Sequence, residues 1–234
     1  MIVVKFGGTS VGDADAIRRA TDVVASRARR SPVVVVSAAS GTTTELLALA
    51  EQAARGQLIG ALRSVEHIRE RHLQMCDSLL KNVATGADTT AEIAAMCDEI
   101  ASLAEALNTL GHITPRSLDA VAAFGEQMSS LLVTEAFRAR GIPAEHVDAR
   151  EIMITSEHFN SAEPRPDAIS ERARDRIAPL VRAGKVPVLG GYIGATSSGI
   201  TTTLGRGGSD YTASLLGAAL AAEDIEIWTD VDGM

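Results

Sequence analysis

The chain has 234 residues and a formal net charge of −8; 46% of its residues are hydrophobic and only 3% are aromatic. This acidity argues against nucleic acid or an anionic membrane as a partner, because like charges repel. No apolar run approaches the ~18 residues of a membrane span, and the chain opens on a strand without a signal peptide. We therefore expect a cytoplasmic protein in which Cys76 and Cys97 are reduced core thiols.

Short β-branched runs alternate with longer amphipathic runs along the chain. Strands separated by helices favour βαβ crossovers, so the pattern predicts an α/β fold whose mostly parallel sheet is covered by helices on both faces. The predicted strands are residues 2–6, 33–37, 144–148, 186–189 and 225–229. The predicted helices are residues 13–30, 43–55, 58–80, 89–110, 115–140, 167–183 and 209–222.

Two regions depart from this alternation. Residues 43–112 contain successive helices with no strand between them, which predicts a helical insertion beside the sheet, broken at Gly56 and at residues 86–88. The last predicted strand is followed by only five residues, 230–234, where a parallel strand normally leads into a covering helix. We expect a single domain over residues 1–234 that is truncated at its C-terminal end.

A lysine stands where the first strand meets a glycine turn. Lys5 follows three buried-type residues and precedes Phe6, Gly7 and Gly8. A lysine in such a place is costly unless it meets an anion, and adjacent glycines let backbone N–H groups approach one closely. The turn therefore predicts a phosphate site.

A second glycine cluster supports this interpretation. Gly205, Arg206, Gly207 and Gly208 precede an alanine-rich helix that Ser209 or Asp210 could cap. A helix N-terminus favours anions, and a guanidinium matches carboxylate or phosphate geometry. A flexible loop before an ordinary helix cap is the alternative. Neither a P-loop nor a dinucleotide-binding pattern occurs.

Further polar residues follow other predicted strands. Ser37 to Thr44 could cap the next helix or hold a polar ligand. Glu126 lies in an otherwise apolar helix, where solvent exposure is the simplest interpretation because an unpaired buried carboxylate is costly. His67 and His72 lack a metal-binding spacing, and we expect surface positions for them.

Five segments together resemble the amino acid kinase family, and within it the aspartokinases. The opening Lys-Phe-Gly-Gly-Thr-Ser and the run Thr-Thr-Thr-Leu-Gly-Arg-Gly-Gly-Ser-Asp are the most specific to aspartokinases. The segments occur in the family's order from end to end of the chain. They are residues 5–11, 37–43, 125–129, 201–211 and 228–231.

The resemblance implies a three-layer αβα fold and a role for each matching residue. Lys5 and Asp210 would be catalytic. Amino acid binding would fall to Ser37, Thr43, Glu126, Arg206, Gly207, Gly208 and Ser209, and nucleotide binding to Lys5, Phe6, Gly7, Gly8, Thr229 and Asp230. Glu126 would then pair with the substrate ammonium. No protein ligand for a metal is implied, since Mg²⁺ would be held mainly by ATP phosphates.

The implied reaction is ATP-dependent phosphorylation of the β-carboxylate of L-aspartate to 4-phospho-L-aspartate. This is the first step of lysine, threonine and methionine biosynthesis. A kinase for another small acidic amino acid, or an inactive binding or assembly fragment, is the alternative.

The family continues beyond this point with further nucleotide-binding residues and ACT regulatory domains. We expect the isolated chain to bind nucleotide weakly, to turn over slowly or not at all, and to lack feedback inhibition. The full-length protein is expected to be a homo-oligomer.

Overall fold

The computed structural model describes residues 1–81 and 83–229, and its centre is a five-stranded parallel sheet. The strand order is β3-β5-β2-β1-β8, with β1 and β2 paired in register from Ile2 opposite Pro32 to Phe6 opposite Val36. The three inner strands, β5, β2 and β1, are mostly aliphatic because both faces of the sheet are covered there. The bounds of the five strands are β1 Ile2–Phe6, β2 Pro32–Val36, β3 Ala144–His146, β5 Val186–Gly190 and β8 Asp224–Trp228.

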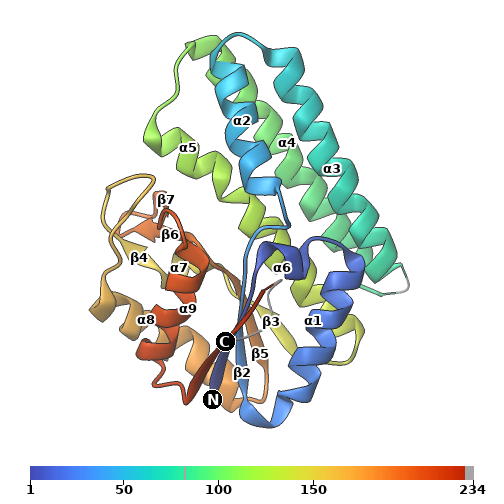
Figure 1. Cartoon of the computed structure of the whole chain (residues 1–234), viewed down its shortest axis with the longest axis vertical. Helices are drawn as coiled ribbons and strands as arrows, with labels where there is room; N and C mark the ends of the chain where they lie inside the picture. Colours follow the sequence, from blue (N-terminus) through green and yellow to red (C-terminus); the bar gives the residue numbers. More distant parts are fainter. Residues whose placement is uncertain (82, 230–234) are drawn as a thin grey trace.

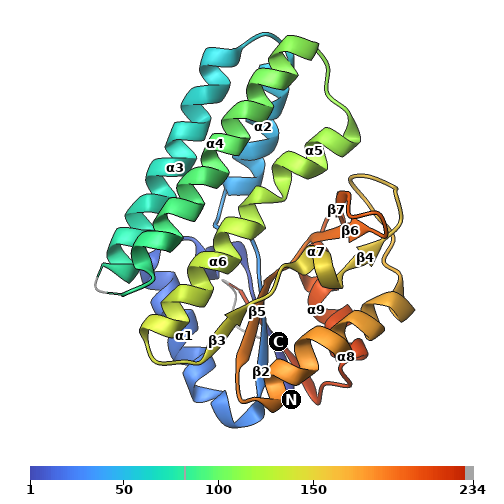
Figure 2. The ribbon, with the colours of Figure 1, turned by 180° about the vertical axis from the view of Figure 1, so that it is seen from behind.

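Helices cover both faces of the sheet, so the predicted three-layer arrangement is confirmed (Figure 1). One face carries α1 (Ala14–Ser26) and α6 (Phe124–Ala139). The other carries α8 (Pro166–Arg182) and α9 (Gly208–Ala219), with the short α7 (Ala149–Ile152) beside α8. Seen from behind in Figure 2, α8 runs along the outside of the second face.

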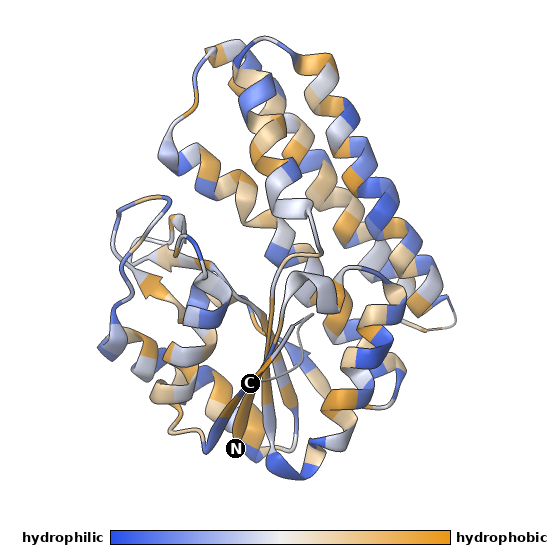
Figure 3. Ribbon diagram, viewed as in Figure 1, coloured by the Kyte–Doolittle hydropathy of each residue, from blue (hydrophilic) through white to orange (hydrophobic). Residues whose placement is uncertain are grey.

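The alternation of side chains along β1 divides the core into two clusters. Ile2, Val4 and Phe6 pack toward α1, α6 and the helical region, whereas Val3 packs toward α8 and α9. Because successive strand residues face opposite ways, Lys5 shares the Val3 face. Figure 3 shows hydrophobic residues along the central strands and a mixture of hydrophobic and hydrophilic residues along the helices. Because it shares the face of Val3, the Lys5 side chain is directed toward α9.

The helical region expected at 43–112 consists of three long helices standing above one end of the sheet (Figure 1). They are α2 (Thr42–Ala54), α3 (Leu58–Leu80) and α4 (Gly86–Leu110). Gly56, predicted as a break between helices, follows the end of α2 and has a φ of +80°. The helix predicted after this region, over residues 115–140, was wrong as a single element. It divides at Ala123 into α5 (Pro115–Ala122) and α6.

A second, three-stranded sheet was not predicted. It contains β4 (Ile154–Thr155), β6 (Ile193–Thr196) and β7 (Thr201–Thr203), in the order β4-β6-β7. β6 and β7 form an antiparallel hairpin that places Thr203 and the following glycine loop above the main sheet. Within the described residues, no helix combines the length and apolarity that crossing a membrane requires.

Candidate active site

A cleft of about 780 Å³ opens at the carboxyl ends of the parallel strands, where ligands of open α/β sheets gather. We call it the main cleft. Its walls come from the ends of β1, β2 and β8, from α6, and from the loop before α9. The predicted site residues that line it are Lys5, Gly7, Gly8, Ser37, Thr43, Glu126, Arg206, Gly207, Gly208, Ser209, Asp210 and Thr229.

Lys5 and Asp210 form an ion pair at the base of this cleft. The distance from Lys5 Nζ to Asp210 Oδ1 is 2.6 Å, and the lysine side chain is 9% exposed while that of Asp210 is 52% exposed. The pair joins β1 to the first turn of α9, which are 205 residues apart in the sequence. The buried partner cannot leave its position, whereas the carboxylate keeps contact with water. Lys5 is thus a fixed cation at the cleft floor.

Close packing requires a glycine at position 8, whereas a Cβ at position 7 would make ordinary contacts. A Cβ at Gly8 would lie 2.9 Å from the carbonyl oxygen of Ala38, and one at Gly7 would lie 3.7 Å from Lys5 Nζ. The Gly7 N–H donates to Trp228 O (2.9 Å), and Gly8 O accepts from Ser40 N (3.1 Å). The turn therefore ties β1 to the loops after β8 and β2.

Glu126 is buried, so the solvent-facing interpretation was wrong. It is 3% exposed; Oε1 accepts a hydrogen bond from Ala38 N (3.1 Å), and Oε2 is a buried atom without a hydrogen-bond partner among the described residues. Burial raises its pKa to about 8, although the hydrogen bond from Ala38 opposes the shift. Gly190 permits this placement, because a Cβ there would lie 2.9 Å from Glu126 Cβ.

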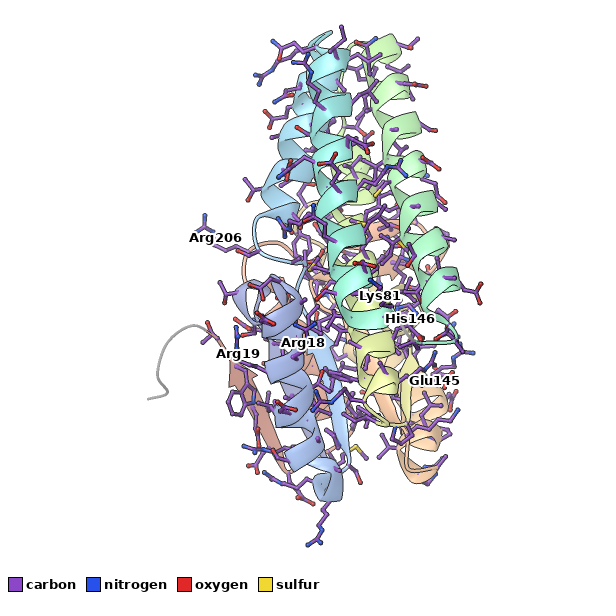
Figure 4. All side chains as sticks on the ribbon, turned by 90° about the vertical axis from the view of Figure 1, so that its right-hand side faces the viewer. Arg18, Arg19, Lys81, Glu145, His146 and Arg206 are labelled. Carbon is purple, nitrogen blue, oxygen red and sulfur yellow. The ribbon has the colours of Figure 1, made fainter. Side chains whose placement is uncertain are left out.

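The residues before α9, which we call the arginine loop (204–207), form the opposite wall. Gly205 and Gly207 both have positive φ, of +76° and +74°. α9 begins at Gly208, so the free N–H groups of its first turn lie at the cleft and favour an anion there. Arg206 is exposed, and Figure 4 shows its side chain extending away from the body of the molecule. Its guanidinium is free to turn toward a ligand.

The loop after β2 is anchored by an arginine that the sequence did not single out. Arg71 of α3 donates from Nη2 to Ser40 O (2.7 Å) and to Thr42 Oγ1 (3.0 Å). Ser37 is fixed on the other side, where its carbonyl oxygen accepts from Ser129 Oγ (2.8 Å). Thr43, in the first turn of α2, faces the cleft from this loop.

Two other cleft residues were missed. Asn160 and Tyr192 line the main cleft, and both have positive φ, of +68° and +64°. Such backbone strain in residues other than glycine gathers at functional sites. Tyr192 follows Gly190 and Gly191 at the end of β5, and this pair of glycines is the one feature of the sequence that indicates a turn there. Asn160 lies in a loop with no motif.

Three expectations need correction or fall outside the structure. Phe6 is 1% exposed and packs in the core, so its side chain does not line the main cleft. His72 is fully buried, which lowers its pKa, whereas His67 is exposed as expected. Asp230 lies outside the described residues. Cys76 and Cys97 are free and buried, as expected.

The charges of the cleft suit a zwitterionic ligand beside a phosphate. Lys5, Arg206 and the first turn of α9 attract anionic groups, and Glu126 offers a buried oxygen to a cation. The described residues contain no group of three or more histidine, cysteine or acidic side chains that could hold a metal ion. Asp210 keeps a half-exposed carboxylate at the cleft, beside Lys5.

Comparison with known proteins identifies a family whose model matches the chain. The family model described as "Amino acid kinase family" matches residues 1–234. The chain belongs to the amino acid kinase family. The chain is 39% identical over 234 residues to the lysine-sensitive aspartokinase 3 of Escherichia coli, and the match covers 100% of the chain and 50% of that protein. It is 32% identical over 236 residues to the chloroplastic aspartokinase 2 of Arabidopsis thaliana, covering 99% and 42%.

The fold of this amino acid kinase chain also matches a solved relative. The structure of E. coli aspartokinase III in complex with aspartate and ADP superposes with a TM-score of 0.87 at 40% sequence identity. The match covers 100% of this chain and 50% of that one. The chain therefore spans about half the length of the aspartokinases it matches.

Proposed function

We propose that this chain forms the aspartate-binding and phosphoryl-transfer portion of an aspartate kinase. The observation that carries the proposal is the buried carboxyl group of Glu126, whose Oε2 has no hydrogen-bond partner among the described residues although Glu126 lines the main cleft. A buried acceptor without a partner is costly unless a ligand completes it. An α-ammonium group is the cation that an amino acid substrate supplies. The similarity to a relative solved with aspartate and ADP supports this choice of ligand.

The remaining cleft residues then have consistent tasks. Arg206 and the first turn of α9 bind substrate carboxylates, with Ser209 and Thr43 as hydroxyl donors. Lys5, Gly7 and Gly8 hold the transferring phosphoryl group, and Thr229 borders the nucleotide. Magnesium bound to ATP would neutralise phosphate charge. These residue roles are proposals drawn from the positions of the side chains in the cleft.

The chemistry needs no general base. A β-carboxylate oxygen of aspartate attacks the γ-phosphorus, the bond to the β–γ bridging oxygen breaks, and ADP leaves with that electron pair. Because the attacking carboxylate is already ionised, no proton moves. The protein contributes positioning and charge stabilisation, for which the fixed Lys5 ammonium at the cleft floor is suited.

Hydroxylamine trapping tests the reaction and its substrate together. The chain is incubated with MgATP, hydroxylamine and either aspartate, glutamate or N-acetylglutamate, and the hydroxamate formed is measured over hours so that slow turnover is visible. We expect aspartate to give the fastest formation. Equal rates with glutamate would favour a kinase for another small acid, and no hydroxamate from any of the three would favour the inactive binding or assembly fragment.

The alternative hypothesis, that the chain is an inactive assembly fragment, has its own test. Light scattering combined with nucleotide titration reports association and ATP binding in one sample. Self-association without any ATP binding would favour an assembly fragment over the kinase. Oligomerisation of the whole protein stays a prediction of the resemblance.

A further inference from the structure

Asp119, on α5, is a buried carboxylate that the reaction as described does not use. It is 1% exposed and forms no ion pair with any described residue. Its oxygens instead accept hydrogen bonds from two segments far away in the sequence. Thr203 donates its hydroxyl to Oδ1 (2.7 Å) and its N–H to Oδ2 (3.0 Å), and Asn160 N donates to Oδ2 (2.9 Å). Burial raises the pKa of Asp119, and these donors oppose the shift.

Both segments that Asp119 holds lead directly to the main cleft. Thr203 is the last residue of β7, and the arginine loop begins at the next residue. Asn160 lines the cleft, and its carbonyl oxygen would lie 3.1 Å from a Cβ at Gly205. A further bond from Ala162 N to Thr203 O (2.8 Å) joins the two segments. The carboxylate thus lies at the point from which the arginine loop departs.

An aspartate is suited to this place because it offers acceptors only. Each donor around it belongs to a backbone or hydroxyl group of the cleft wall, so one carboxylate fixes the direction of Thr203 and the strained conformation of Asn160 (φ +68°) together. Charge-assisted hydrogen bonds of this kind are stronger than neutral ones. The arginine loop has positive-φ glycines on both sides of Arg206 and needs such an anchor.

We propose that Asp119 is a positioning residue that holds the arginine loop so that Arg206, Ser209 and Asp210 face the amino acid substrate. The proposal rests on the proposed function for the identity of that substrate, but the anchoring itself is a property of the unliganded chain. Because α5 packs against α2, the helical region above the sheet contributes to the position of Asp119 and so to the shape of the cleft.

The first test measures the anchoring without any ligand. Amide hydrogen exchange is compared for wild type, Asp119→Asn and Asp148→Asn under conditions where circular dichroism shows all three folded. Asp148 is the matched control, because its carboxylate accepts hydrogen bonds from Arg150 N (2.9 Å) and Nε (3.0 Å) away from the main cleft. We expect exchange at Asn160 and Thr203 to accelerate at least tenfold in Asp119→Asn alone. Unchanged exchange there would overturn the proposal.

The second test measures L-aspartate affinity by calorimetry. We expect Asp119→Asn to weaken binding at least tenfold, and Asp148→Asn to leave it within twofold. Thr203→Val should weaken binding as well, whereas Thr203→Ser, which keeps the hydroxyl, should restore it. In an Asp119→Ala background Thr203→Val should add little, since the Thr203 hydroxyl has then already lost its acceptor.

The two tests separate the inference from the function beneath it. If wild type binds no aspartate, the proposed function fails for this chain while the exchange measurement still decides the anchoring. If wild type binds aspartate and Asp119→Asn binds it equally well, the positioning role is wrong and the proposed function stands.

Discussion

Glu126 is the residue whose environment and proposed task are most closely linked. Its carboxyl group is enclosed by the β2 loop and by Gly190, and among the described residues only one of its oxygens receives a hydrogen bond, from Ala38. Leaving a buried acceptor unsatisfied costs about 1–3 kcal/mol, and more if the group is charged. Proteins keep such destabilised groups where function requires them. The unliganded chain lowers this cost by holding the carboxyl protonated up to a pH of about 8.

Stability should therefore depend on pH through Glu126. Its pKa rises from 4.5 to about 8 on folding, so the stability that the protonated form contributes is complete below pH 4.5 and is lost as the pH rises to about 8. Glu126→Gln lacks this titration. Between pH 4.5 and about 8 we expect the free energy of unfolding of Glu126→Gln, relative to that of wild type, to rise by up to about 1.4 kcal/mol per pH unit. Urea denaturation at pH 5, 7 and 9 measures the difference, and a constant difference would contradict the account.

Lys5 should matter for transfer far more than for folding. Lys5→Met keeps the buried stem and removes the charge, and Asp210, whose side chain is 52% exposed, can return to water. We expect hydroxamate formation to fall at least 100-fold, since the cation that stabilises the transferring phosphoryl group is gone. The free energy of unfolding should change by less than about 2 kcal/mol. Retained turnover would make Lys5 a structural residue.

At the scale of elements, the site depends on how closely β5 and its turn approach α6 and α9. Gly190 faces Glu126 on α6, and Gly191 faces Ser209 on α9. A Cβ at Gly191 would lie 2.7 Å from Ser209 Cβ and 2.8 Å from Ser209 Cα. The second of these is a backbone atom, which a side-chain rotation cannot move. The glycine pair thus sets the width of the cleft between its two helices.

Gly191→Ala should push the first turn of α9 away from the sheet. We expect a loss of about 1–3 kcal/mol in free energy of unfolding, as for other overpacked sites, together with weaker aspartate binding. Gly60→Ala is the control. Gly60 lies within α3, and the added methyl meets only the end of the flexible Gln52 side chain. That variant should be neutral or gain up to about 1 kcal/mol. Equal effects of the two changes on aspartate affinity would contradict the role of Gly191.

The elements that could be predicted are those with a strong and long pattern. β1, β2 and β5 are continuous aliphatic runs, and α3 is 23 residues long, so each was placed within a residue or two. The strands β4, β6 and β7 have only two to four residues rich in threonine and glycine, too short for a periodic signal. The break between α5 and α6 falls at Ala123, a strong helix former, and Gly125, two residues further on, lies within α6.

The site was predictable to the extent that its residues stand beside glycines or at strand ends. Lys5 and Arg206 satisfy this condition, and the sequence located both. Asp119 and Arg71 do not, because each acts from a helix on a loop distant in the sequence. A single acidic residue in an amphipathic helix is ordinarily solvated, so its burial could be learned only from the fold.

At the scale of the whole molecule, the parallel sheet gathers charges from opposite ends of the chain. β1 lies between β2 and β8, so the turn after Lys5 meets loops from residues 37–43 and from Thr229 at one edge. The helical region and the second sheet stand on either side of this edge (Figures 1 and 2). The anionic chain, of net charge −8, thus concentrates Lys5 and Arg206 at one cleft. This is the condition for binding an acidic substrate selectively.

The most direct measurement is calorimetric titration of L-aspartate against succinate, which has the same two carboxylates but no ammonium group. If Glu126 receives the substrate ammonium, wild type binds aspartate at least tenfold more tightly than succinate at pH 8, and Glu126→Gln loses that preference while remaining folded. Equal affinity of wild type for the two acids, or an unchanged preference in Glu126→Gln, would contradict an amino acid site in this cleft.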